Sequence, residues 1–259
     1  MNKNGGLVHH ARQYDKLFLL RRLLQMNRKY LAFDIETAKI LPEDFGDLLA
    51  HRPLGICCTA TWASGEDAAE IFYSIGPDGK PAAQMSQDDV SKFIDVLLAY
   101  AQKGYTILTV NGLGFDFDVL AEESNRLEDC RQLARHHVDM LFHIFCGKGF
   151  GVGLNAAAKA IGLSKPVDVD GSVAPQLWKH GEYQRVLDYV AQDCQLTLAI
   201  AEASETHRAF KWITRKGSPA SFALPSGWLT VQEAMGLPLP DTSWMDHPWP
   251  RSKFTGWLG

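Results

Sequence analysis

Apolar residues along the chain gather in short runs typical of buried strands and in longer stretches with helical spacing. The short runs, rich in β-branched and aromatic residues, predict strands at 30–35, 55–62, 70–75 and 105–110. Helices are predicted at 8–28, 86–102, 115–126, 154–161 and 182–207. Residues 137–142 are interpreted as a short strand or the start of a helix. The turn at 65–67 predicts that the second and third strands form an antiparallel hairpin.

The order of these elements predicts the fold class. Three strands come first and helices then alternate with strands, which favours an α/β protein with a mixed β-sheet flanked by helices. The C-terminal region differs in composition, since residues from 217 hold six of the twelve prolines and residues from 212 hold five of the seven tryptophans. We therefore expect an N-terminal helical extension (1–28), an α/β domain (29–206) and a Pro/Trp-rich C-terminal extension (207–259) that wraps over the core in an extended form.

Composition indicates a folded protein of the cytoplasm. The chain has 259 residues, of which 46% are hydrophobic and 22% charged, so it is globular and can bury a large core. Its five cysteines are scattered and form no Cys-x-x-Cys pair, which is typical of reduced thiols in a cytoplasmic protein. No apolar run approaches the roughly 20 residues that span a bilayer, so we expect no membrane partner.

Charge is distributed unevenly along the chain. The formal net charge is -4, which argues weakly against a tight, sequence-independent nucleic-acid binder. From residue 207 onward, however, six Lys and Arg residues stand against three acids, so this part carries +3 and the remainder -7. Bound divalent cations would neutralise part of the acidic remainder.

Five residues in three clusters carry the candidate chemistry. Asp34 and Glu36 are two apart on a predicted strand, so both side chains leave the same face. Tyr189 and Asp193 are four apart on a predicted helix and share its face. Asp116 lies at the start of a helix that follows a strand. Each cluster alone is more typical of a structural role, but carboxylates beside a hydrophobic core are costly unless they are paired or bind metal.

The order and form of these clusters resemble those of a known superfamily. Asp34 and Glu36, then Asp116, then Tyr189 with Asp193 match the three motifs of the DEDD superfamily of 3′–5′ exonucleases, which has a ribonuclease-H-like fold. The Tyr-x-x-x-Asp form is that of its DEDDy branch. The segments 154–163 and 177–181 are similar to predicted exonucleases related to the proofreading domain of family B DNA polymerases. The resemblance covers residues 29–206 and implies a ribonuclease-H-like exonuclease domain there.

The resemblance implies a role for each residue. Asp34 would bridge two divalent cations, Mg²⁺ or Mn²⁺, with Glu36 and Asp193 completing the site of the attacking water. Asp116 would help hold the ion beside the leaving 3′ oxygen. Tyr189 would orient the water, because a phenol with a pKa of about 10 is a poor base at neutral pH. The expected reaction releases nucleoside 5′-monophosphates from single-stranded 3′ ends, of DNA in preference to RNA.

Several assignments remain open at this stage. Asp118 competes with Asp116, although the Asn-Gly-x-x-Phe-Asp pattern favours the latter. Asn111 and Phe115 are expected to bind the terminal nucleotide, or else to serve as a turn residue and a core aromatic. Asp139 lies where relatives carry a structural aspartate and is left unassigned.

The glycine-rich segment 147–153 lacks the Lys-Ser/Thr of a phosphate-binding loop, so we expect a mobile loop from which Lys148 or Phe150 could reach substrate. The C-terminal tryptophans would pack on the core or stack on bases. The competing functions are a non-catalytic nucleic-acid-binding or scaffold module on the same fold and, less favoured, an endonuclease. The sequence points to no particular protein partner.

Overall fold

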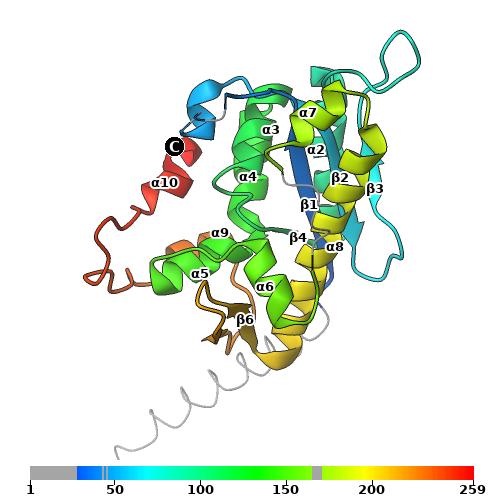
Figure 1. Ribbon diagram of the computed structural model, residues 1–259. Helices are drawn as coiled ribbons and strands as arrows, with labels where there is room; N and C mark the ends of the chain where they lie inside the picture. The colour runs from blue at the N-terminus through cyan, green and yellow to red at the C-terminus, as the bar shows by residue number, and fades with distance from the viewer. Residues whose placement is uncertain (1–27, 43, 45, 165–170) are drawn as a thin grey trace, which may run out of the picture.

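A five-stranded mixed sheet forms the centre of the molecule, with strand order β3-β2-β1-β4-β5 (Figure 1). This computed structural model describes residues 28–259 except 43, 45 and 165–170. The central strand β1 (Tyr30–Thr37) pairs antiparallel with β2 (Ile56–Ala63) and parallel with β4 (Thr106–Thr109). At the edges, β3 (Glu70–Phe72) is antiparallel to β2 and β5 (Val138–Asp139) is parallel to β4. The predicted mixed sheet and the hairpin of the second and third strands are confirmed.

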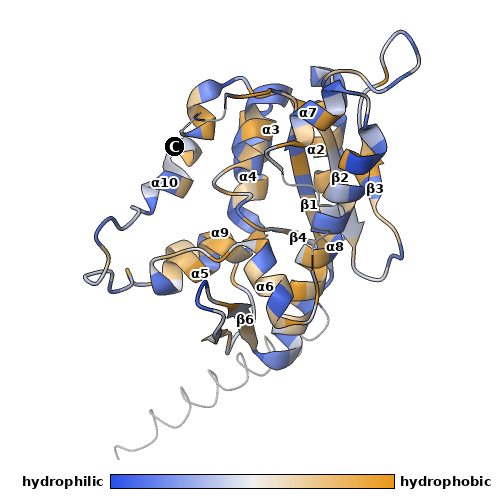
Figure 2. Ribbon diagram, in the orientation of Figure 1, coloured by the Kyte–Doolittle hydropathy of each residue, from blue (hydrophilic) through white to orange (hydrophobic). Residues whose placement is uncertain are grey.

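Helices cover both faces of the sheet. One face packs against α2 (Gln87–Gln102), α3 (Asp116–Ser124) and α4 (Leu127–His136). The other face packs against α7 (Ala174–Lys179) and the long α8 (Tyr183–His207), which crosses β1 and β2. Figure 2 shows the hydrophobic positions of these helices turned toward the sheet. The result is the α/β sandwich that the element order predicts.

The side chains of β1 alternate between two hydrophobic cores. Leu31, Phe33 and Ile35 point toward α2 and α3, whereas Tyr30 and Ala32 point toward α8. Successive strand residues point to opposite faces of a sheet, so this alternation fixes the face that every later residue of β1 occupies. Both cores are almost completely buried, which holds the strand rigidly in the middle of the molecule.

Two further helices join the sandwich to its C-terminal region. Residues 137–142 contain both predicted alternatives, since the two-residue strand β5 runs directly into α5 (Met140–Lys148). Next comes α6 (Leu154–Ala160), close to its predicted bounds. The sequence did not predict α4 or α7, and it predicted only the start of α5.

The segment after α8 contains regular structure instead of the expected extended wrap. Strands β6 (Ala209–Ile213) and β7 (Pro219–Ala223) form an antiparallel hairpin. The short helices α9 (Val231–Met235), α10 (Ser252–Thr255) and η2 (Gly256–Leu258) follow. Side chains of this segment enter both cores, which explains why its many prolines do not prevent it from packing closely.

The helix predicted at 8–28, and with it nearly all of the expected N-terminal extension, lies outside the described residues. One more short helix, η1 (Leu48–His51), follows β1. Within the part of the chain that the structure describes, no helix combines the length and apolarity needed to cross a bilayer.

Candidate active site

The first two carboxylates lie on the face of β1 that α8 covers. Asp34 and Glu36 continue the even-numbered series of Tyr30 and Ala32, whose side chains belong to the core beneath α8. Glu36 is only 5% exposed and Asp34 is half-buried. The pairing of β1 with β2 shifts register just after Glu36, an irregularity typical of strands that aim a side chain into a site.

The third cluster reaches this face from α8. Tyr189 and Asp193 are one helical turn apart and are 8% and 7% exposed. They belong to the buried stripe of α8, which packs against β1 and β2. The predicted shared face is therefore directed at the strand that carries Asp34 and Glu36.

Asp116 meets Asp34 from the end of the sheet. It is the first residue of α3 and is 4% exposed. Its carboxyl group shares a hydrogen bond with that of Asp34 and accepts one from the backbone N–H of Ile35. Burial raises the pKa of Asp116 to about 7, with a further rise from the charge of Asp139, and the hydrogen bonds oppose this shift. The two carboxyl groups are therefore within hydrogen-bonding distance of each other where the start of α3 meets β1.

Glu36 and Tyr189 meet beside a glycine. A Cβ atom built on Gly171 would lie 3.8 Å from the Glu36 Oε2 atom and 3.8 Å from the Tyr189 Oη atom. The carboxylate and the phenol therefore face one small space next to Gly171. No motif in the sequence pointed to this glycine, because it lies in a loop without periodic structure.

The raised pKa values of two buried thiols indicate that the carboxylates lie close together. Burial raises the pKa of the Cys194 thiol, and three carboxylates raise it further, those of Asp34, Asp193 and Asp116. On β2, the pKa of Cys58 is raised by its hydrogen bond to Cys57, by burial, and by the charges of Glu36 and Asp34. The four acids thus surround one region between β1, α3 and α8.

The neighbouring acid Asp118 is directed elsewhere. Its carboxylate forms an ion pair and hydrogen bond with Arg52, which also lies 3.8 Å from Glu122. Asp116 and Asp118 are two apart in a helix and therefore leave different faces. The structure brings Asp116, and not Asp118, to Asp34.

Asp139 organises the loop that precedes Asp116. Its carboxylate accepts hydrogen bonds from the backbone N–H groups of Asn111, Leu113 and Phe142, at 3.0, 2.9 and 3.0 Å. It is the N-cap of α5 and is 1% exposed. Burial raises the pKa of Asp139, and these backbone hydrogen bonds oppose the rise. The residue that the sequence left unassigned thus anchors the 111–113 turn to α5.

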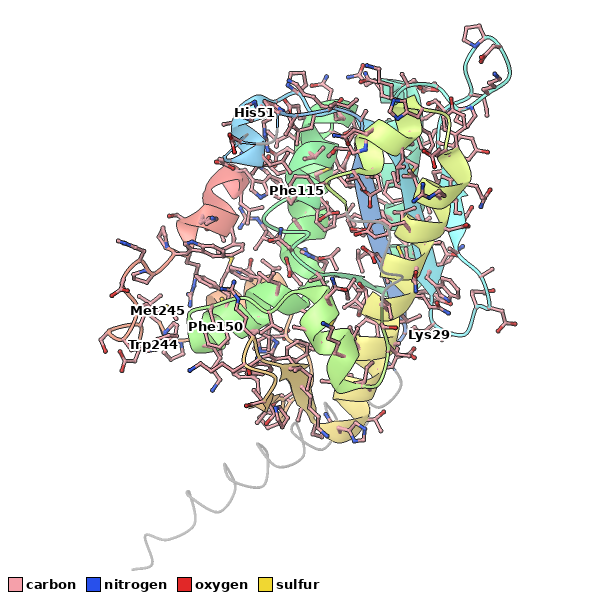
Figure 3. The ribbon with its side chains drawn as sticks, viewed as in Figure 1. Lys29, His51, Phe115, Phe150, Trp244 and Met245 are labelled. Atoms are coloured by element: carbon pink, nitrogen blue, oxygen red, sulfur yellow. The ribbon has the colours of Figure 1, made fainter. Side chains whose placement is uncertain are left out.

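The two expected substrate-binding residues border the site. Asn111 has a left-handed backbone (φ 75°) and its Oδ1 would approach a Cβ on Gly114 to 2.9 Å, so it shapes the turn. Phe115 precedes Asp116 as the N-cap residue of α3 and packs partly against the core. Figure 3 shows Phe115 between α3 and the sheet. Both lie within a few residues of Asp116, and a contact with nucleotide stays a prediction.

The donor chemistry fits a hard divalent cation, although a complete cage is not preformed. Among the described residues, no three His, Cys, Asp or Glu side chains converge closely enough to hold a metal ion as they stand. The groups present are nevertheless buried carboxylates, the ligands that Mg²⁺ and Mn²⁺ prefer. Negative groups in one buried region repel one another, so a bound cation would stabilise their charged forms.

Residues 54–204 match the family model of the RNase_H superfamily, and the chain belongs to that superfamily, whose members are generally nucleases. The matched range includes Asp116, Tyr189 and Asp193 and begins after β1.

A solved structure supports the same fold. The family B DNA polymerase from the hyperthermophilic archaeon Pyrobaculum calidifontis is similar, with a TM-score of 0.50 and 22% identity over 68% of this chain. The similarity covers 24% of the polymerase chain. At this identity the likeness concerns the fold alone. No curated protein matches the sequence.

Proposed function

We propose that this protein is a metal-dependent 3′–5′ exonuclease of the DEDDy type. The observation that carries the proposal is the meeting of carboxylates from three separate elements, with Asp34 hydrogen-bonded to Asp116 and with Glu36 and Tyr189 facing one space beside Gly171. Asp193, one turn after Tyr189, completes the set. Burying several acids together costs free energy that a structural role does not recover, whereas cation binding does.

Each residue of the set has a proposed task. Two Mg²⁺ or Mn²⁺ ions, when bound, would stabilise the attacking and leaving oxygens of an in-line displacement at phosphorus. Asp34, as the residue nearest the centre, would hold both; Glu36 and Asp193 would hold the ion on the side of the attacking water. Asp116 would serve the side of the leaving 3′ oxygen. The Tyr189 hydroxyl would orient the water.

The proposed substrate is a single-stranded 3′ end, with DNA favoured. Three of the four acids are only 4–7% exposed, a burial that favours an unpaired terminal nucleotide over a duplex end. The fold likeness to a DNA polymerase adds modest support for DNA over RNA. Asn111 and Phe115 are proposed to contact the terminal nucleotide, because they lead directly into Asp116. All five cysteines are free and buried, in keeping with the expected cytoplasmic location.

The proposed division of the chain follows from the same arrangement. Residues 29–206 supply every element that carries the candidate site, and residues 207–259 pack onto this part through Phe254 and Trp228, which are 3% and 0% exposed. We propose the first as the exonuclease domain and the second as an extension of it.

The direct experiment is a nuclease assay on matched 3′-labelled and 5′-labelled oligonucleotides with Mg²⁺, Mn²⁺ or chelator. Metal-dependent shortening from the 3′ end with release of 5′-monophosphates is expected. Asp34→Ala should abolish turnover while the protein stays folded, and Tyr189→Phe should slow it less. Asp188→Ala is the matched control, because Asp188 is exposed on the same helix and is hydrogen-bonded only to Gln184 among the described residues.

Two outcomes would contradict the proposal. Internal fragments without 3′ shortening would indicate an endonuclease. Oligonucleotide binding without any metal-stimulated cleavage would favour the competing function, a non-catalytic binding or scaffold module on the same fold.

A further inference from the structure

One cavity among the described residues lies away from the carboxylates. The glycine-rich loop, the turn of the β6–β7 hairpin and Trp244 enclose about 830 Å³, a space that we name the hairpin groove. Its lining includes Phe150, Trp212, Arg215, Lys216 and Trp244. A second cavity of about 500 Å³ adjoins it through the same three aromatic residues and adds Lys148 and Asp241.

Aromatic rings form the wall between the two cavities. The ring centre of Phe150 lies 6.3 Å from that of Trp212 and 6.2 Å from that of Trp244. Trp212 is 8% exposed and anchors the group, whereas Trp244 is 65% exposed. Figure 3 shows Phe150, Trp244 and Met245 gathered on one side of the molecule. The exposed indole of Trp244 packs against Phe150, which in turn packs against the buried Trp212. Planar groups can stack on such an exposed, supported ring.

The backbone of the glycine-rich loop is fixed by the C-terminal extension. Gly149 ends α5 with a left-handed conformation (φ 82°), and a Cβ there would lie 2.4 Å from the Thr242 Cγ2 atom. A Cβ on Gly147 would lie 2.6 Å from the Phe222 ring. These glycines permit close packing, and Gly147 and Lys148 belong to α5 instead of the expected loop. The groove is therefore built before any ligand arrives.

Positive charge borders the groove. Arg215 and Lys216 are exposed on the hairpin turn, and neither forms an ion pair with any described residue. Lys148 stands over the Phe222 ring at 5.7 Å, and Asp241 is the acid that lines the smaller cavity. This surface belongs to the segment that carries +3 in a chain of net charge -4. An aromatic platform beside unneutralised cations is complementary to bases joined by phosphates.

We propose that the hairpin groove binds single-stranded nucleic acid, with bases stacked on Trp244 and Phe150 and phosphates held by Arg215 and Lys216. Asp193 lies 14 residues before the end of α8, and the hairpin that lines the groove follows that end. A strand long enough to reach both places would have its upstream part in the groove and its 3′ end at the carboxylates. This polarity rests on the proposed function, whereas binding itself does not.

The test is fluorescence anisotropy with labelled dT₂₀ and the full-length protein in chelator, so that no strand is cut. Trp244→Ala should weaken dT₂₀ binding by about tenfold, the scale of one lost base stack. Arg215→Ala/Lys216→Ala should reduce the slope of log affinity against log salt by about 1.4, because each lost phosphate contact contributes about 0.7. Trp249→Ala (51% exposed) and Lys80→Ala/Lys103→Ala, all outside the groove, are the controls.

Unchanged dT₂₀ affinity and salt slope in folded groove variants, or equal losses in the controls, would overturn the inference. The experiment distinguishes a failure of the exonuclease proposal from a failure of the groove proposal. If the wild-type protein binds dT₂₀ through the groove but never shortens it with metal, the exonuclease proposal fails and the groove stands. If trimming proceeds while the groove variants bind normally, only the groove proposal fails.

Discussion

At the scale of single residues, spacing in the sequence predicted which side chains share a face of a strand or helix. Two residues apart on a strand and four apart on a helix mean shared faces, and Asp34 with Glu36 and Tyr189 with Asp193 do share them. Spacing could not separate Asp116 from Asp118, since that distinction depends on Arg52, 66 residues away from Asp118. The contacts of Asp139 could not be predicted either, because its partners are backbone N–H groups whose positions only the fold determines. The catalytic roles themselves remain predictions.

His137 should make the protein sensitive to acid. Its ring is buried against Phe117, hydrogen-bonded to Thr109 and to the Ala134 carbonyl, and burial lowers its pKa to about 3. The unfolded chain binds a proton near pH 6.5 and the folded chain does not, so stability falls as pH decreases from 6.5 toward 3. The expected loss at pH 5 is about 2 kcal/mol from this residue.

The difference between the denaturant unfolding profiles of the wild-type protein and His137→Gln between pH 7 and 5 measures that loss, because protonation of Asp116, whose pKa is raised to about 7, stabilises both proteins over the same range. His137→Gln should flatten the decline, although it lowers stability at pH 7, and His136→Gln, at an exposed neighbouring position, should leave the decline unchanged. Burial also lowers the pKa of His143, to about 4, so some decline should persist in His137→Gln. An identical pH profile in both variants would contradict this account.

At the scale of elements, the strands of the sheet and most of its helices were predicted, whereas α4, α7 and the β6–β7 hairpin were not. The sequence located β1, α2 and α8 to within a few residues, and Ser86 caps α2 as expected by accepting from the Asp89 N–H. The hairpin β6–β7 was missed because Pro219 and the following small residues resemble an irregular segment. Its pairing depends on contacts with α6 and α8.

Asp139→Ala should destabilise the junction of β5 and α5. Three buried backbone N–H groups would lose their acceptor, which costs about 3 kcal/mol or more in unfolding free energy. Asp47→Ala removes the exposed cap of η1, where the Leu49 N–H donates at 3.2 Å, and should cost about 1 kcal/mol or less. Chemical denaturation compares the two variants. Similar small losses would show that the 111–113 turn does not depend on Asp139.

Gly149→Ala should loosen the packing of the C-terminal extension on α5. The added methyl group would meet Thr242 in a left-handed conformation, a combination of strain and overlap that costs about 1–3 kcal/mol. Gly256 has φ -61° and nothing within 4 Å of an added Cβ, so Gly256→Ala should be neutral. Limited proteolysis should cut the extension of Gly149→Ala sooner. Equal cleavage rates in both variants would contradict the packing role of Gly149.

At the scale of the whole molecule, the sheet topology positions the acids, and the charge distribution separates an acidic domain from a basic C-terminal extension. The order β3-β2-β1-β4-β5 places the acids at the centre of an otherwise negative domain, and the C-terminal extension supplies the basic and aromatic surface that this domain lacks. Composition predicted the basic extension. It could not predict that Phe254, near the chain end, packs 4.7 Å from Phe145 in the core, because no local pattern records such a distant contact.

The measurement that tests the central claim most directly is the rate of Mg²⁺-dependent 3′ trimming by the wild-type protein, Asp116→Asn and Asp118→Asn. The two substitutions are chemically identical and two residues apart, but only Asp116 reaches Asp34. We predict that Asp116→Asn lowers the rate by about 10²–10³-fold, the scale of losing one stabilising group in a transition state. Asp118→Asn should retain most of the activity. Equal rates in the two folded variants, or a greater loss in Asp118→Asn, would contradict the proposed site.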